Sequence, residues 1–280
     1  MTGGSEMTGG SDSSGFDLGA YRRRIGHDGP FAPDLGTLGT ILAAHAAAIP
    51  FENLDPLLAR PVSLELPALT AKLLGSRRGG YCFEQNTLLA AALETIGFRV
   101  TRLAARVRWM RPKEQPEGPR THMLLRVDLG GDVFIADAGF GGHTLAGPVR
   151  LAPGREQALP ESRVRVLPAP DGFLLQAALP AGWTDLYRFT LEPHSVQDYA
   201  VANWFTATHP SALFTTNLLA ERLTPQSRDM LFNRALTRRL ADGSVRARTL
   251  ADGAELGAVL EDVFAITPPV DPAVIWARLG

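Results

Sequence analysis

The first hundred residues repeat apolar positions with a helical period. Between residues 33 and 48 the apolar side chains of Leu35, Leu38, Ile41 and Leu42 recur at intervals of three and four, which places them on one face of a helix. Residues 67–76 and 82–96 are two further helix candidates, and Gly97 suits the C-terminus of the last one. This part of the chain is therefore predicted to form a helical bundle.

The period changes to two after residue 100, which indicates β-strands. Apolar side chains alternate with arginines in residues 102–110, and residues 122–129 and 132–137 are two strands joined by Gly130-Gly131, a hairpin turn. Further strands are expected at 163–167, 173–178 and 183–191. The middle third is predicted to be an antiparallel sheet curled into a barrel.

The last third mixes the two patterns, with helices at 194–205 and 254–266 and a hairpin at 239–249 around Asp242-Gly243. The fold class is α+β, with a helical bundle, a β-barrel and an α/β lid in chain order. The expected divisions are a disordered Gly/Ser-rich leader at 1–15, the bundle at 16–98, the barrel at 99–200 and the lid at 201–280.

Composition excludes several classes of function. The 280 residues carry 28 basic and 29 acidic side chains, a balance that gives no reason to expect nucleic acid or a membrane surface as a partner. No apolar run is long enough to span a membrane. A single cysteine forms no internal disulfide, so a cytoplasmic location is expected. Composition leaves the oligomeric state open, homo-oligomers included.

That single cysteine, Cys82, follows Gly79-Gly80 and begins a predicted helix. A lone cysteine is most often a small buried hydrophobic residue. At a helix start, however, free backbone N–H groups and the positive end of the helix dipole favour the ionised thiolate. Cys82 is therefore a candidate nucleophile.

A base for this nucleophile is sought among six histidines. His45 suits a hydrogen-bonded core position, and His143 closes the run "GFGGH", which suits a surface turn. His122 begins a strand, and Asp137 ends the next strand on its apolar face, where a carboxylate needs a partner. The short hairpin brings the start of one strand to the end of the other, so His122 and Asp137 are expected to be neighbours. The three residues form a candidate Cys-His-Asp triad.

Other chemistries find no support in the sequence. The cysteine and histidines lack the spacing of a zinc site, and no metal is expected. Neither a phosphate-binding GxxxxGK[ST] loop nor a GxGxxG after a strand is present.

Five blocks of the sequence resemble the arylamine N-acetyltransferase family. They are "RRGGYCFEQN" (77–86), "IPFENLD" (49–55), "RTHMLL" (120–125), "IADAGFGG" (135–142) and "NWFTATHPSALFTTNLLA" (203–220). The resemblance implies a papain-like catalytic core made by the bundle and the barrel. It also implies acetyl-CoA as co-substrate and an arylamine, hydrazine or N-hydroxyarylamine as acceptor. Cys82, His122 and Asp137 occupy the family's triad positions, with an acetyl thioester on the cysteine as the intermediate.

The resemblance assigns further positions by their place in the same blocks. Glu52 and Arg78 match a buried structural ion pair. Phenylalanines match positions lining the acceptor pocket, namely Phe51, Phe140 and Phe214. Residues in the matching blocks suggest contacts to CoA, namely Thr121, Thr208 and His209. Phe205 replaces a tyrosine common in the last block.

Three other functions remain open at this point. An amide synthase that closes a polyketide macrolactam would use the same triad, and a larger pocket would distinguish it. A thiol hydrolase would resolve the acyl-enzyme with water in place of an amine. A non-catalytic CoA- or amine-binding protein would have no use for the triad.

Overall fold

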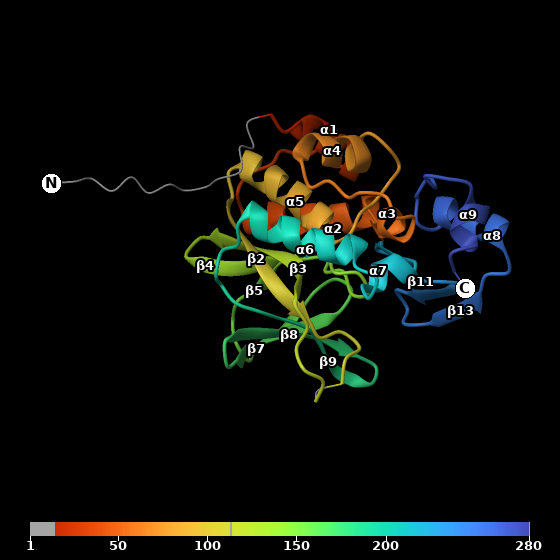
Figure 1. The fold of residues 1–280 in the computed structure, drawn as a ribbon. Coiled ribbons are helices and arrows are strands. Elements are labelled where there is room, and N and C mark those ends of the chain that lie inside the picture. The colour runs from red at the N-terminus through yellow and green to blue at the C-terminus, as the bar shows by residue number, and fades with distance from the viewer. Residues whose placement is uncertain (1–14, 113, 280) are drawn as a thin grey trace.

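The computed structural model describes residues 15–112 and 114–279. The leader expected at 1–15 lies outside these residues except for Gly15. Three parts follow one another along the chain and pack side by side (Figure 1).

The first part consists of helices, as predicted. They are α1 (Leu18–Ile25), α2 (Leu35–Ala48), α3 (Leu54–Leu57), α4 (Leu66–Leu69) and α5 (Cys82–Ile96), with a π-helical turn η1 (Thr70–Leu74) after α4. Asp34 caps α2 by accepting the Thr37 N–H, and Gly97 ends α5 with a φ of 106°, a conformation that favours glycine. The start and end of α5 therefore follow directly from the sequence.

The second part is one antiparallel sheet of eight strands in the order β5-β4-β3-β2-β9-β8-β7-β6. The strands are β2 (Arg99–Val107), β3 (Arg120–Leu129), β4 (Asp132–Ala136), β5 (Val149–Arg150), β6 (Glu156–Ala158), β7 (Arg163–Ala169), β8 (Gly172–Leu179) and β9 (Gly182–Phe189). The two edges meet through Gln157 of β6, whose side chain bonds the N–H and C=O of Arg150 in β5. The sheet is thus a nearly closed barrel, which confirms the predicted fold class.

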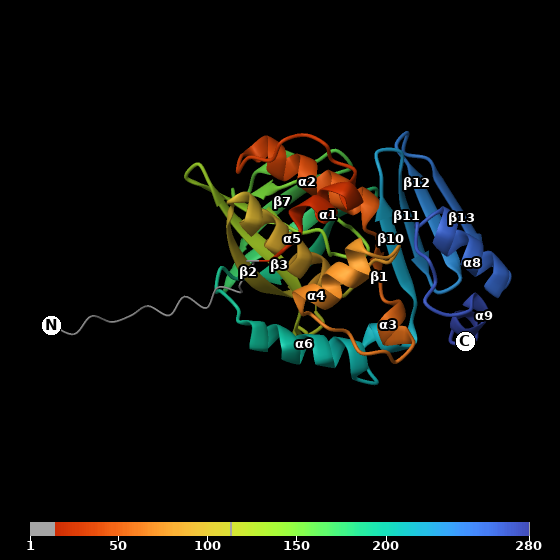
Figure 2. The same ribbon diagram turned by 90° about the horizontal axis from the view of Figure 1, so that it is seen from above.

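The third part combines helices with a five-stranded antiparallel sheet in the order β1-β10-β11-β12-β13. Its elements are α6 (Val196–Thr208), α7 (Leu213–Thr216), β10 (Leu219–Leu223), β11 (Ser227–Phe232), β12 (Ala235–Leu240), β13 (Val245–Thr249), α8 (Gly253–Asp262) and α9 (Pro272–Trp276). Its edge strand β1 (Phe51–Glu52) comes from the helical part. Seen from above, β10 runs beside β1, while α8 and α9 lie on the outer side of the sheet (Figure 2).

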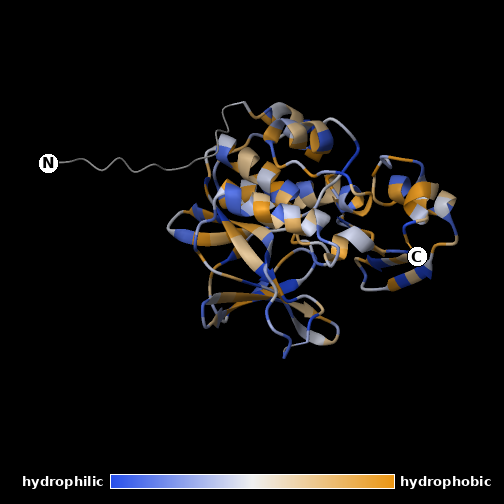
Figure 3. Cartoon of the chain, viewed as in Figure 1, coloured by the Kyte–Doolittle hydropathy of each residue, from blue (hydrophilic) through white to orange (hydrophobic). Residues whose placement is uncertain are grey.

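Buried apolar side chains in the described residues form three large clusters and one smaller one. One lies between α5 and the outer face of β3, where Leu89 and Leu93 pack in the same cluster as Met123 and Leu125. A second fills the barrel, and a third lies between the C-terminal sheet and its helices. Apolar residues are accordingly spread over helices and strands of all three parts (Figure 3). Within residues 15–112 and 114–279 no helix has the length and apolarity needed to cross a bilayer.

Candidate active site

Cys82 is the first residue of α5 and lies where the helical part meets the barrel. The Gly-Gly pair before Cys82 lets the backbone pass close to neighbouring groups, because a Cβ on Gly79 would stand 1.9 Å from the Pro50 carbonyl oxygen. A Cβ on Gly80 would stand 2.7 Å from Oε2 of Glu84. Glu84 in turn accepts the Tyr81 N–H at 3.0 Å and so caps the helix. The Cys82 side chain is 4% exposed, and its thiol lies 3.6 Å from the Thr121 carbonyl oxygen.

A buried cluster of charges supports the start of this helix. Arg78 bonds Glu52 at 2.8 Å, so the ion pair expected from the "IPFENLD" block is present. Arg78 also reaches Asp55 at 3.0 Å, and Lys72 lies 2.6 Å from both Asp55 and Glu84. Two cations and three carboxylates therefore pair around the turn that presents Cys82, which offsets most of the cost of burying them, and burial raises the pKa of Glu84 to about 7.

His122 and Asp137 approach each other at one end of the barrel. In the ladder between β3 and β4, Leu125 faces Ala136, so Asp137, one residue beyond β4, is a diagonal neighbour of His122. The Nε2–H of His122 donates to Oδ2 of Asp137 at 2.7 Å, and both residues are buried. The neighbour relation predicted from the hairpin is present.

The charge states of this pair follow from their surroundings. Burial by itself lowers the pKa of His122, but the charge and hydrogen bond of Asp137 and the hydrogen bond and charge of Cys82 outweigh it and raise the pKa to about 10. Burial by itself raises the pKa of Asp137, yet His122, Asn86 and the Gly139 N–H together hold that pKa below its ordinary value. An imidazolium beside a carboxylate is therefore the resting state. Because Nε2 is bound to Asp137, Nδ1 is the ring nitrogen left for the Cys82 thiol.

Two residues with no role predicted from the sequence complete this arrangement. Asn86 donates to Oδ1 of Asp137 at 2.9 Å and accepts the Ala138 N–H at 3.1 Å. It stands four residues after Cys82 on α5, a spacing that puts both on one helix face, and this spacing was a signal available in the sequence. Tyr187 packs its ring 4.8 Å from that of His122. No local motif marks Tyr187, because it reaches the site from a distant strand.

A cavity of about 480 Å³ opens beside these side chains. Its walls include Cys82, His122 and Thr121. The three phenylalanines named in the sequence also line it, namely Phe51, Phe140 and Phe214. Two glycines in the wall allow close packing, since a Cβ on Gly139 would stand 2.7 Å from the Cα of Cys82. A Cβ on Gly141 would stand 2.5 Å from the Phe51 ring. The cavity offers flat apolar walls next to a thiol.

The other predicted positions lie elsewhere. Thr208 and His209 do not line this cavity; the Thr208 hydroxyl donates to the Trp204 carbonyl, and His209 stacks on Phe205 at 4.7 Å. Their contact to CoA stays a prediction. The surface position expected for His143 is wrong, because the residue is 4% exposed and packs on Trp109 at 6.0 Å. His45 is a core residue as expected, bonded to Tyr21 and Gln85.

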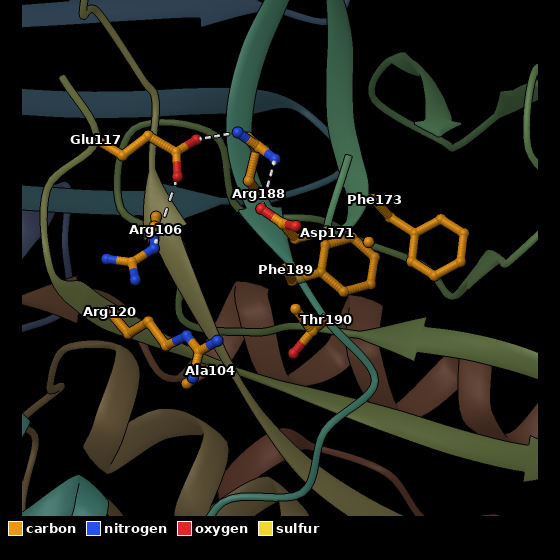
Figure 4. Close-up of a pocket in the computed structure, with 10 residues that line it drawn as sticks. Ala104, Arg106, Glu117, Arg120, Asp171, Phe173, Arg188, Phe189 and Thr190 are labelled. Carbon is orange, nitrogen blue, oxygen red and sulfur yellow. Dashed lines mark hydrogen bonds and ion pairs between the residues drawn. The ribbon is translucent and has the colours of Figure 1, made fainter. Parts of the chain in front are cut away.

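A second cavity, of about 400 Å³, lies on the outer face of the barrel (Figure 4). Three arginines stand in register across β3, β2 and β9, namely Arg120, Arg106 and Arg188. Such like charges repel one another, and carboxylates offset them: Glu117 bridges Arg106 and Arg188, while Glu192 lies 3.3 Å from Arg120. Glu117 thereby anchors residues 114–119 to the barrel, the segment whose end, Pro119, lines the cavity beside Cys82.

The described residues, 15–112 and 114–279, contain no cluster of three or more His, Cys, Asp or Glu side chains arranged to hold a metal ion. The candidate chemistry in this part of the chain consists of a thiol, an imidazole and a carboxylate.

Comparison with known proteins places this site in a family. An N-acetyltransferase family model matches residues 34–271. The chain is 46% identical to the arylamine N-acetyltransferase of Mycolicibacterium smegmatis over 224 residues, which is 79% of this chain and 82% of the relative. It is 38% identical to the Escherichia coli enzyme of the same name over 250 residues, 89% of this chain and 88% of that one.

Solved structures agree with this result over nearly the whole chain. The arylamine N-acetyltransferase structure from M. tuberculosis superposes with a TM-score of 0.90 at 38% identity, covering 94% of this chain and 100% of that one. The Mycobacterium marinum enzyme in complex with CoA superposes with a TM-score of 0.90 at 37% identity, covering 94% and 98%. Coverage and identity at this level leave one conclusion: the chain belongs to the arylamine N-acetyltransferase family and is an acetyltransferase.

Proposed function

We propose that this protein transfers an acetyl group from acetyl-CoA to the nitrogen of an arylamine, a hydrazine or an N-hydroxyarylamine, by way of a thioester on Cys82. The observation that carries the proposal is that Cys82 and His122, from a helix and a β-hairpin, line one apolar cavity and that His122 is bonded to the buried Asp137. The names of the relatives and the CoA bound to the M. marinum structure support arylamines as acceptors and acetyl-CoA as co-substrate.

In the first step the Cys82 thiolate attacks the carbonyl carbon of acetyl-CoA, with His122 protonated beside it. A carbon–sulfur bond to Cys82 forms and the bond to the CoA sulfur breaks, while His122 gives its proton to the departing CoA thiolate. Asp137 holds the imidazole through Nε2 during this transfer, so that Nδ1 faces the reacting sulfur atoms.

In the second step the acceptor nitrogen attacks the thioester carbon, and His122 takes the proton from that nitrogen. The resting pKa of His122 is held high partly by the hydrogen bond and charge of Cys82. Acetylation removes both, so the pKa of His122 falls in the acyl-enzyme and the imidazole becomes a better base when a base is needed. The nitrogen–carbon bond forms, the bond to Cys82 breaks, and the thiolate is regenerated.

The cavity also bears on the alternatives. Its volume of about 480 Å³ lies within the usual range for small-molecule sites of roughly 300–1,000 Å³. Rings from Phe51, Phe140 and Phe214 provide flat walls that suit an aromatic amine. A small aromatic acceptor fits this space better than a long polyketide chain, which favours transfer to arylamines over macrolactam closure.

The proposal is tested by incubating the purified protein with acetyl-CoA and measuring CoA release with and without a panel of arylamines and hydrazines. We expect release that depends on the acceptor and yields the N-acetylated amine. Equal release with water alone would indicate a hydrolase instead. The same assay with longer acyl-CoAs measures the selectivity for the donor.

The pH dependence of Cys82 alkylation follows from the charge on His122. With its pKa raised to about 10, His122 is positively charged at neutral pH and favours the ionised thiol beside it. This favourable charge is present below about pH 10 and is lost as pH rises through that value. At neutral pH we therefore expect iodoacetamide to alkylate Cys82 faster than it alkylates the same cysteine beside an uncharged residue 122, and we expect this advantage to disappear as pH rises through about 10.

Replacing His122 by glutamine is the matched control for that measurement. The variant keeps a side chain able to hydrogen-bond but carries no charge, so its alkylation at neutral pH should be slower than that of the wild-type protein. Equal alkylation rates in the two proteins would show that His122 does not activate Cys82.

A further inference from the structure

A buried ion pair in the C-terminal sheet contacts the loop that walls the acceptor cavity. Glu221 of β10 is 2% exposed and Arg228 of β11 is 8% exposed. In the ladder Glu221 faces Met230, so Arg228 is its diagonal neighbour on the same face, and Nη1 of Arg228 donates to Oε1 of Glu221. Both residues stand outside the Cys-His-Asp group.

The pair binds three backbone groups within one short stretch of chain. Oε2 of Glu221 accepts the Gly142 N–H, and Oε1 accepts the Thr144 N–H at 3.1 Å. Nη2 of Arg228 donates to the Thr144 carbonyl at 2.9 Å. Buried backbone groups need such partners, and here a carboxylate and a guanidinium from another part of the fold provide them.

This stretch directly continues the cavity wall. The Thr144 hydroxyl donates to the Phe140 carbonyl at 3.2 Å, and the ring of Phe140 lies 5.1 Å from that of His122. The ring of Phe51 fills the space that a side chain on Gly141 would need. A shift of Gly142 or Thr144 is therefore passed to the two phenylalanines that shape the cavity, whereas Cys82 belongs to α5 and Asp137 keeps its bonds to Asn86 and His122.

We infer that Glu221 and Arg228 are positioning residues that set the width of the acceptor site and so its selectivity for the size of the amine. This inference rests on the proposed function. Loss of the pair loosens the wall at Phe140 and Gly141, so an acceptor with two fused rings loses its contacts. Hydrazine itself, which is too small to depend on that wall, is little affected, and acetylation of Cys82 by acetyl-CoA is preserved.

The test compares Glu221→Gln with the double variant Glu221→Gln/Arg228→Met, in which no buried guanidinium is left without its partner. Asp229→Asn is the matched control. Asp229 is 2% exposed and pairs with Arg238 in the same sheet, and neither this ion pair nor its hydrogen bond with Ser227 involves Gly142 or Thr144. All proteins are assayed at a temperature where circular dichroism shows them folded. The readouts are acetylation of Cys82 by intact mass, and KM and kcat for a naphthylamine and for hydrazine.

We expect both Glu221 variants to raise KM for the naphthylamine by about tenfold or more, since small displacements of a positioning wall have effects of this size. The extent of Cys82 acetylation and the KM for hydrazine should stay within about threefold of the wild-type values. Asp229→Asn should leave the ratio of the KM for the naphthylamine to the KM for hydrazine unchanged. An unchanged ratio in the Glu221 variants, or an equal change in Asp229→Asn, would overturn the inference. Absence of acceptor-dependent turnover in the wild-type protein would instead overturn the proposed function, so the two failures are distinguishable.

Discussion

Replacing Cys82 by alanine is expected to lower acceptor-dependent CoA release by about 10⁴-fold or more, as is usual when a covalent nucleophile is removed. Cys82 is the single cysteine of the sequence, and its thiol lies on the cavity wall together with His122. Without it the acetyl group has no place on the protein between donor and acceptor. The measurement is CoA release in the presence of an arylamine, together with the mass of the protein after incubation with acetyl-CoA.

The alanine variant should remain folded, because the substitution removes only one sulfur atom, and that atom borders an existing cavity. Its circular dichroism spectrum should match that of the wild-type protein. An alanine variant that still turns over at a comparable rate, or still gains an acetyl group, would remove Cys82 from the mechanism.

Replacing Asp137 by asparagine is expected to reduce turnover by about 10⁴-fold through the wrong tautomer of His122. Oδ1 of Asp137 already accepts N–H groups from Asn86 and Gly139, so the single oxygen of an asparagine is held at that position. Its amide NH₂ then faces Nε2 of His122, which must become an acceptor. The ring proton moves to Nδ1, and Nδ1 can no longer take a proton from a thiol or an amine.

The measurement for this variant is kcat with an arylamine, and Asp128→Asn is its control. Asp128 pairs with Arg126 on the same β-hairpin but at its far end, and its loss should leave kcat unchanged. A turnover of Asp137→Asn near the wild-type value would mean that another group fixes the tautomer of His122.

Much of the site could be predicted because its residues lie in elements with strong local signals. Gly79-Gly80 and Gly97 mark both ends of α5, and alternation with a Gly-Gly turn marks the hairpin of β3 and β4. These two elements carry Cys82, His122 and Asp137, so their geometry follows from local pattern. The family resemblance added the phenylalanines and the pair of Glu52 and Arg78, which periodicity alone does not reveal.

Other features could not be predicted because distant parts of the chain create them. Strands β10 and β11 contain Glu221, Arg228 and Asp229. Charged residues are usually exposed to solvent, but each of these is buried beside an ion-pair partner. That pairing hides the alternation of a half-buried strand. The prediction for His143 is wrong for a similar reason. Its glycine run suggests a turn at the surface, but Glu221 and Arg228 bind the backbone on both sides of His143 and hold it in the interior.

Mass spectrometry of protein mixed with acetyl-CoA, quenched in acid and digested, tests whether the acetyl group is bound to the sulfur of Cys82 before it moves to nitrogen. We expect one acetyl group on the peptide containing Cys82 when no acceptor is present, and its rapid loss when an arylamine is added. Protein that acetylates an arylamine while Cys82 is never found acetylated would show that the thioester is not an intermediate.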